Sequence, residues 1–134
     1  MENQGVAQWS VKVNDRAGDD PPVLGEYLDA EDRFREPEPC SAFLVTHLYY
    51  QAVYGYNAMD HLGRAHIGES ELAIIEKTWP FIGQSSNVRA FGRNGQAACV
   101  LEGALQLYVG GRSRRDFDAL VAEFAGIGVA IESR

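Results

Sequence analysis

Alternating hydrophobic and polar positions predict the strands of this chain. Apolar side chains alternate with polar ones over 7–13 and again over 127–131, which is the pattern of a strand buried on one face. From Asn87 onward the period shifts to two, and three further runs are typical of strands: 88–91, 97–101 and 104–109. Asn94 and Gly95 separate the first two of these, and this pair favours the tight turn of a hairpin. We therefore predict a three-stranded antiparallel meander and two terminal strands.

Two segments with helical spacing carry start and stop signals. Ser113 and Asp116 form a capping box, and the apolar residues after them recur every three or four positions. Gly126 is expected to end this helix in the left-handed conformation. Ser70 is the expected N-cap of another helix, which stops at Pro80.

Residues 41–62 are apolar at both helical and alternating spacing. Ser41 follows a proline, and Gly63 suits the left-handed residue after a helix, so these flanking residues favour a helix. Gly55 and the many β-branched and aromatic side chains favour a strand or a break instead. We interpret the segment as a helix and leave an interruption at Gly55 open. A helix that is apolar on nearly every side is central in the fold or has one face against another subunit.

The amino-terminal part of the chain is acidic. Residues 1–40 contain ten acidic and four basic side chains, and so hold −6 of the net charge of −7. The segment 15–39 is punctuated by prolines, and we predict a loop over 15–22. Apolar residues of 24–34 lie near helical spacing, which predicts one short amphipathic helix. We therefore interpret 15–39 as an acidic loop or docking segment laid on the rest of the chain.

The order of predicted elements indicates an α+β fold. We expect a single domain over 1–134, with a mostly antiparallel sheet packed by two to three helices. A chain of 134 residues is long enough to bury a core without disulfide bonds. Cys40 and Cys99 are the two cysteines, and their spacing matches no redox or metal motif, which is typical of a reducing compartment.

Charge and hydropathy narrow the classes of function. The net charge of −7 and a pI near 4.9 disfavour binding to the phosphate backbone or to anionic lipid. The apolar runs fall short of the roughly 18 residues of a membrane span, and the polar start has no basic region of a secretion signal. We therefore expect a cytoplasmic protein without direct contact to nucleic acid or membrane.

His47 is the candidate catalytic residue. On a helix it shares a face with Tyr50 and Tyr54, where a neutral histidine can serve as a general base and tyrosine hydroxyls can orient a carbonyl. The structural alternative is a half-buried histidine that hydrogen-bonds to the backbone or to a tyrosine. Spacing fixes no partner acid or nucleophile, so the sequence leans against an enzyme. A small-ligand-binding protein, or a small isomerase or hydrolase, with a His47/Tyr-lined pocket is our second hypothesis.

Two other segments contain groups that bind ions. Arg112, Arg114 and Arg115 follow two glycines where a strand gives way to a helix. They form a candidate anion-binding site or, alternatively, a capped helix start with solvated arginines. Residues 60–71 contain two histidines and three carboxylates, but their spacing fits no metal site and favours a solvated loop. We predict no metal and no cofactor.

Our first hypothesis is a small acidic protein that acts by protein–protein contact. Apolar residues of the acidic segment would anchor a partner with a basic surface, and carboxylates would steer its approach. The candidate binding residues are Tyr27, Leu28, Asp29, Glu31, Asp32, Phe34, Tyr50 and Tyr54. Inhibitors, immunity or anti-defence factors and specialised chaperones are proteins of this kind. A third hypothesis is a homodimer formed through a free sheet edge or through the predicted helix over 41–62.

Overall fold

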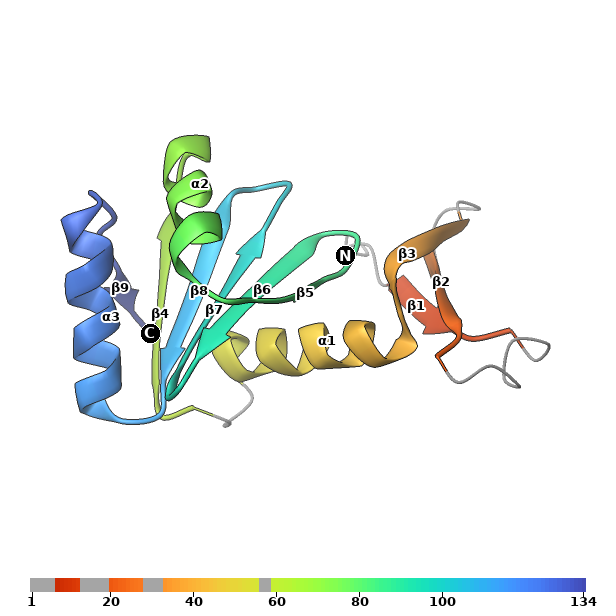
Figure 1. Cartoon of the computed structure of the whole chain (residues 1–134), viewed down its shortest axis with the longest axis horizontal. Helices are drawn as coiled ribbons and strands as arrows, with labels where there is room; N and C mark the ends of the chain where they lie inside the picture. Colours follow the sequence, from red (N-terminus) through yellow and green to blue (C-terminus); the bar gives the residue numbers. More distant parts are fainter. Residues whose placement is uncertain (1–6, 13–19, 28–32, 56–58) are drawn as a thin grey trace, which may run out of the picture.

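Two antiparallel sheets and three helices make up the described part of the chain (Figure 1). The structure is a computed structural model that describes residues 7–12, 20–27, 33–55 and 59–134. Its elements are β1 (Ala7–Ser10), β2 (Pro22–Tyr27), β3 (Arg33–Pro39), α1 (Cys40–Tyr54), β4 (His61–His66), α2 (Glu69–Thr78), β5 (Phe81–Gln84), β6 (Val88–Arg93), β7 (Gln96–Leu101), β8 (Gln106–Gly111), α3 (Arg114–Gly126) and β9 (Glu132–Ser133). This confirms the predicted α+β class with mostly antiparallel pairing.

The large sheet has the strand order β5-β6-β7-β8-β4-β9. Its strands β6, β7 and β8 form the predicted meander, and β4 lies antiparallel beside β8. In the turn between β6 and β7, Arg93 pairs with Gln96, and Gly95 has a φ of +76°. Glycine adopts this conformation without strain, so the Asn94–Gly95 signal identified the turn correctly.

Helices cover both faces of the large sheet (Figure 1). On β7, Ala97 and Cys99 pack in the core under α1, whereas Ala98 and Val100 pack in the core under α2 and α3. A strand that is buried on both faces is apolar at successive positions rather than at alternating ones. This explains the continuous apolar run of 97–101.

The small sheet, β1-β2-β3, lies at the amino-terminal end of α1 (Figure 1). It shows that the prediction of a helix over 24–34 is wrong, because β2 and β3 are antiparallel strands. A Cβ at Gly25 would lie 2.2 Å from the Phe34 ring, so this ring packs on the backbone of the opposite strand. Such cross-strand packing outweighs a weak helical spacing. Pro22, expected in the loop, begins β2 opposite Pro39.

Helix α1 confirms the first part of the predicted 41–62 helix and corrects its end. The helix ends at Tyr54, and Gly55, with a φ of +124°, is its C-cap. A glycine at positive φ turns the chain away from the helix axis, which is why the helix stops there. Gly63 does not follow a helix but lies in β4, where a Cβ would come within 2.4 Å of Ile131 Cγ2.

Helix α3 begins as predicted and ends at the predicted residue by another route. Ser113 Oγ accepts the backbone N–H of Asp116 at 3.1 Å, which confirms the N-cap. Gly126 is the last helical residue, but the positive φ of +85° belongs to Gly128. The helix is therefore closed two residues beyond the glycine that the pattern singled out.

The prediction of a solvated loop over 60–71 is wrong, because this segment contains β4 and the first turn of α2. Gly68, rather than Ser70, is the N-cap of α2. The hydroxyl of Ser70 instead donates a hydrogen bond to Glu71 at 2.8 Å. Strand β4 contains the polar residues His61, Arg64 and His66, so its few apolar residues do not form a recognisable strand pattern.

The terminal strand is shorter than predicted. Residues 127–131 do not form it; instead, the two-residue β9 pairs with β4. Val129 is buried in the core under α3 and Ile131 packs against that core, which accounts for their alternation. Strand β5 was not predicted, because four residues after a proline are too few to establish a period.

Candidate functional site

Helix α1 has no Asp, Glu, Lys or Arg among its 15 residues. Its inner side buries Phe43 and Val53 against the sheets. On its outer side, Leu44, Val45 and Leu48 are 55%, 41% and 65% exposed. We call these three residues the α1 stripe. A surface helix normally carries charged side chains on its outer side, so an uncharged helix with an apolar outer face requires an explanation.

The position of α1 is fixed by close approach to two glycines of the large sheet. A Cβ at Gly83 would lie 2.4 Å from Thr46 Oγ1, and one at Gly92 would lie 2.3 Å from Tyr49 Cε1. The helix can lie this close to β5 and β6 only because both positions lack a side chain. The α1 stripe is therefore held on a rigid support and points away from the sheet.

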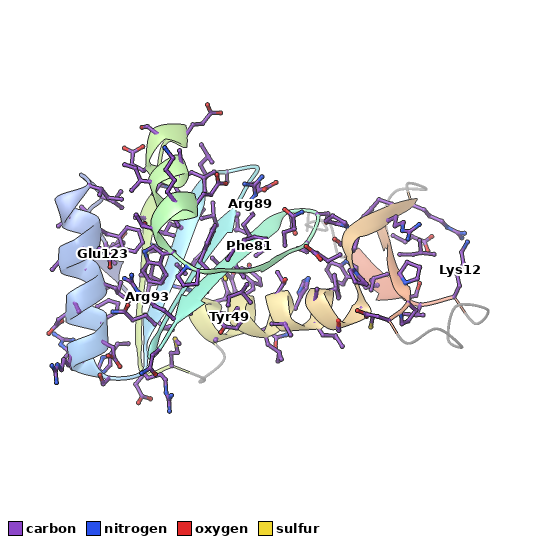
Figure 2. All side chains as sticks on the ribbon, viewed as in Figure 1. Lys12, Tyr49, Phe81, Arg89, Arg93 and Glu123 are labelled. Carbon is purple, nitrogen blue, oxygen red and sulfur yellow. The ribbon has the colours of Figure 1, made fainter. Side chains whose placement is uncertain are left out.

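An open groove of about 540 Å³ runs beside the α1 stripe, between α1 and the β6–β7 turn. Its apolar wall consists of Leu48, Tyr49, Ala52 and Met59. Its other wall comes from 92–97 and from Arg112. Figure 2 shows Tyr49 where α1 meets the sheet. Because Leu48 belongs to both features, the stripe and the groove form one continuous surface, which we call the α1 face.

Of the two arginines at the groove, only one is available to a ligand. The Arg93 guanidinium pairs with Glu123, donates from Nε to Gln96 Oε1 at 2.7 Å and lies 3.8 Å from the Trp79 ring centroid (Figure 2). Arg112 is exposed, and its side chain has no partner within the described part of the chain. Among the described residues, the α1 face thus combines an apolar wall with one cation, Arg112, that has no side-chain partner.

The three candidate anion-binding arginines do not gather at this groove. Arg112 lines it, whereas Arg114 forms an exposed pair with Asp118 at 3.4 Å on the outside of α3. Arg115 is exposed in the first turn of the same helix. Anion binding by this group stays a prediction, and the arrangement favours Arg112 alone as a contact of the groove.

His47 lies at the junction between α1 and the small sheet rather than in the groove. Its ring centroid is 4.3 Å from that of Phe43 and 5.1 Å from that of Trp9. Its Nε2 is buried and has no hydrogen-bond partner among the described residues. Burial lowers the pKa of His47, and the nearby charge of Glu36 acts in the opposite direction. A half-buried imidazole between aromatic rings fits a packing role better than catalysis.

Glu36 joins the small sheet to the body of the protein. Glu36 is 3% exposed, and its carboxylate accepts a hydrogen bond from Trp9 Nε1 at 2.8 Å. It also accepts the backbone N–H of Ser86 at 2.5 Å and the hydroxyl of Ser86 at 3.0 Å. Three donor groups from two other segments of the chain therefore meet at this carboxylate, and pattern analysis did not single it out.

The remaining candidate binding residues lie in different places. Tyr50 and Tyr54 form an aromatic cluster with Tyr108, with ring centroids 5.3 to 6.4 Å apart, on the side of α1 away from the groove. Phe34 packs on Gly25 in the small sheet. Tyr27 is the last residue of β2, whereas Leu28, Asp29, Glu31 and Asp32 lie outside the described residues. Their role as anchors and steering charges stays a prediction.

Within the ranges that the structure describes, no three His, Cys, Asp or Glu residues are close enough to hold a metal ion. His61 and His66 have opposite parity on β4, so their side chains leave opposite faces of the strand. Cys40 and Cys99 are both free, and burial raises the pKa of Cys99 to about 12. These residues therefore contribute no reaction centre to the α1 face.

The α1 stripe was missed by pattern analysis, although a signal for it exists. Residues 39–59 contain no charged side chain, which is a long interval for a chain with 23% charged residues.

In the described part of the chain, no helix is long and apolar enough to cross a membrane. No protein-family model, no curated protein and no solved structure matches the chain.

Proposed function

We propose that this chain is a protein-binding protein and that the α1 face is its docking surface. The observation that carries the proposal is the exposure of Leu44, Val45 and Leu48 on a helix without a single charged residue. Contiguous exposed apolar side chains beside a groove are typical of sites that another protein covers. The free Arg112 at the rim adds one polar contact to an otherwise apolar surface.

The chemistry of the α1 face favours a protein over a lipid surface or an enclosed small molecule. Helices that lie on membranes carry Lys and Arg beside their apolar face, and α1 has neither. Pockets for small molecules surround most of the ligand, whereas this groove is open along its length and continues onto a convex helix. A partner segment that lies along α1 would cover both parts.

The acidic amino-terminal part would act as the steering element of this binding protein. Asp29, Glu31 and Asp32 belong to the segment that holds most of the net charge, and they would speed the approach of a partner with a basic surface. In this view the chain acts in the cytoplasm as an inhibitor, an immunity or anti-defence factor, or a specialised chaperone. All four roles require contact with a protein and none requires a reaction centre.

Affinity capture with matched variants tests the proposal. The wild-type chain, a Leu44→Glu/Leu48→Glu variant and a Phe81→Glu control are immobilised and exposed to extract from the organism that encodes them. Phe81 is 54% exposed on β5, and its ring packs against Phe91, so the control adds a charge at a comparably exposed apolar position outside the α1 face. We expect the α1 variant to retain about tenfold less of the specifically bound protein. Equal retention by all three would overturn the proposal.

A second candidate function is binding of a small anionic ligand in the groove. The observation that favours it is the free Arg112 beside the apolar wall of Tyr49 and Ala52. A panel of carboxylates and phosphates would then raise the melting temperature of the wild type but not of Arg112→Ala. An enzymatic version, with His47 as the base, predicts that His47→Ala abolishes turnover of such a ligand.

A further inference from the structure

We infer that the occupant of the α1 stripe is a second copy of this chain, related to the first by a two-fold axis. The inference rests on the proposed function, because it names the partner of the same docking surface. Three observations support it: the order of the exposed residues along α1, the absence of charged residues from this helix, and the accessibility of its outer side.

The outer side of α1 has a symmetric order of side chains. Ser41, Leu44, Leu48 and Gln51 are all exposed and share the side opposite the sheet, at spacings of three, four and three residues. The order of these four positions, polar, Leu, Leu and polar, is the same in both directions along the helix, whereas the third stripe residue, Val45, has His47 as its counterpart in the reversal. A two-fold axis requires a surface that complements itself under such a reversal.

An antiparallel pair of α1 helices therefore has a specific register. With the axis passing over the centre of the stripe, opposite the buried Thr46, Leu44 of one subunit faces Leu48 of the partner subunit. Ser41 then faces Gln51 of the partner subunit at each end. The apolar contacts lie at the centre and the polar ones at the rim, which is the usual arrangement of a protein interface.

Charge favours a second copy over a basic partner at this position. Two identical surfaces repel one another when they carry net charge, but residues 39–59 carry none in a chain whose net charge is −7. The charges beside the stripe lie at its rim, where Asp20 accepts from Ser41 and Arg112 lines the groove. A basic protein would be attracted to the acidic residues of 1–40 instead of to the uncharged stripe. The outer side of α1 is also open to a partner, since no other described element lies over it (Figure 1).

The size of the contact sets the expected affinity. The three stripe residues together expose roughly 300 Å² of apolar surface, which is the size of a functional patch on many monomers. A standard interface buries about 800 Å² per subunit, so the groove walls next to Leu48 must supply much of the remainder. We therefore expect a small interface and a dimer that dissociates at micromolar concentration.

Sedimentation equilibrium of the full chain tests this inference. From about 1 µM to about 300 µM, the wild type is expected to change from monomer to dimer. Leu48→Glu should remain a monomer over this range, whereas the Phe81→Glu control should dimerise like the wild type. A wild type that stays monomeric at the highest concentration overturns the inference, and so does a Leu48→Glu variant that dimerises normally.

A charge-pairing experiment tests the register. Leu44→Lys and Leu48→Glu are each expected to be monomeric, because each places one charge against an apolar residue of the partner subunit. An equimolar mixture of the two should form a heterodimer, in which Lys at 44 faces Glu at 48. No heterodimer, with a dimeric wild type, would overturn the antiparallel register.

The outcomes also separate this inference from the proposed function. A monomeric wild type whose captured partner is lost in the Leu44→Glu/Leu48→Glu variant overturns the homodimer and supports docking of a different protein. A dimeric wild type whose capture is unaffected by these substitutions supports the homodimer and overturns heterologous docking on α1.

Discussion

Glu36 accepts the backbone N–H of Ser86 at 2.5 Å, across 50 positions of the chain. This bond links β3 of the small sheet to the segment between β5 and β6 of the large sheet. The same carboxylate also accepts the indole N–H of Trp9 from β1. The buried Glu36 carboxylate therefore helps to fix the orientation of the small sheet at the end of α1, and the hydrogen bonds it accepts should be measurable in stability.

Removal of the Glu36 carboxylate should loosen the small sheet. In Glu36→Ala the donors of Trp9 and Ser86 lose their acceptor, and the charge-assisted hydrogen bonds to the buried carboxylate are lost. We expect the free energy of unfolding to fall by about 2 kcal/mol. Urea unfolding measures the loss, and the indole N–H resonance of Trp9 should move. Glu38→Gln is the control on the same strand, and a similar loss there would contradict the role given to Glu36.

Acid should destabilise the protein through His47. Burial lowers the pKa of His47 in the folded state below its ordinary value of 6.5, so the unfolded chain binds the proton more tightly. The contribution of His47 to the free energy of unfolding is constant above pH 6.5. Below pH 6.5, the free energy of unfolding falls as the pH drops through the lowered pKa of the folded state. Urea unfolding at several pH values should show this fall in the wild type and a smaller one in His47→Gln. His66→Gln, at an exposed position, should behave like the wild type.

Two glycines near α3 should respond in opposite directions to alanine. A Cβ at Gly111 would lie 2.6 Å from the backbone nitrogen of Phe117, and neither backbone segment can move away easily. We expect Gly111→Ala to cost about 2 kcal/mol or more of stability. Gly126 is helical and has open space around its Cβ position, so Gly126→Ala should stabilise by about 0.5 to 1 kcal/mol. Thermal unfolding of both variants checks the pair, and equal signs would refute this packing.

The acidic segment should control the rate of partner binding and its dependence on salt. Reversal of charge at Asp29, Glu31 and Asp32 removes the attraction that speeds encounter with a basic partner. For the protein captured by the wild type, we expect the association rate to fall by about tenfold at low salt and to become less sensitive to salt. Surface plasmon resonance measures both. An unchanged rate would show that the acids do not steer the partner.

Elements with strong local signals could be predicted from the sequence. The Asn94–Gly95 turn and the Ser113 cap depend on a few neighbouring residues, and both are present in the structure. In the small sheet, β1 lies within the predicted strand over 7–13. Its partners β2 and β3 could not be predicted, because Phe34 packs on Gly25 across two strands, and this contact leaves no period along the chain. Tertiary packing of this kind overrides weak local spacing.

The candidate site could be predicted only in part. The interpretation of 41–62 as a helix, either central in the fold or with one face against another subunit, includes the segment of α1 but did not single out Leu44, Val45 and Leu48. Contact with another subunit stays a prediction. Helix α1 faces the sheet with the side that contacts Gly83 and Gly92, and both glycines lie far from α1 in the sequence. The groove depends on the same contacts, so neither feature is visible in hydropathy alone.

Oxidative footprinting in intact cells is the most direct measurement of whether protein covers the α1 face. Hydroxyl radicals modify exposed Leu and Phe side chains, and Leu48 and Phe81 are comparably exposed in the isolated chain. In dilute purified protein, we expect both residues to be modified. In cells, Leu44 and Leu48 should be protected while Phe81 remains reactive. Equal modification of Leu48 and Phe81 in cells and in dilute solution would contradict the assignment of α1 as a docking surface.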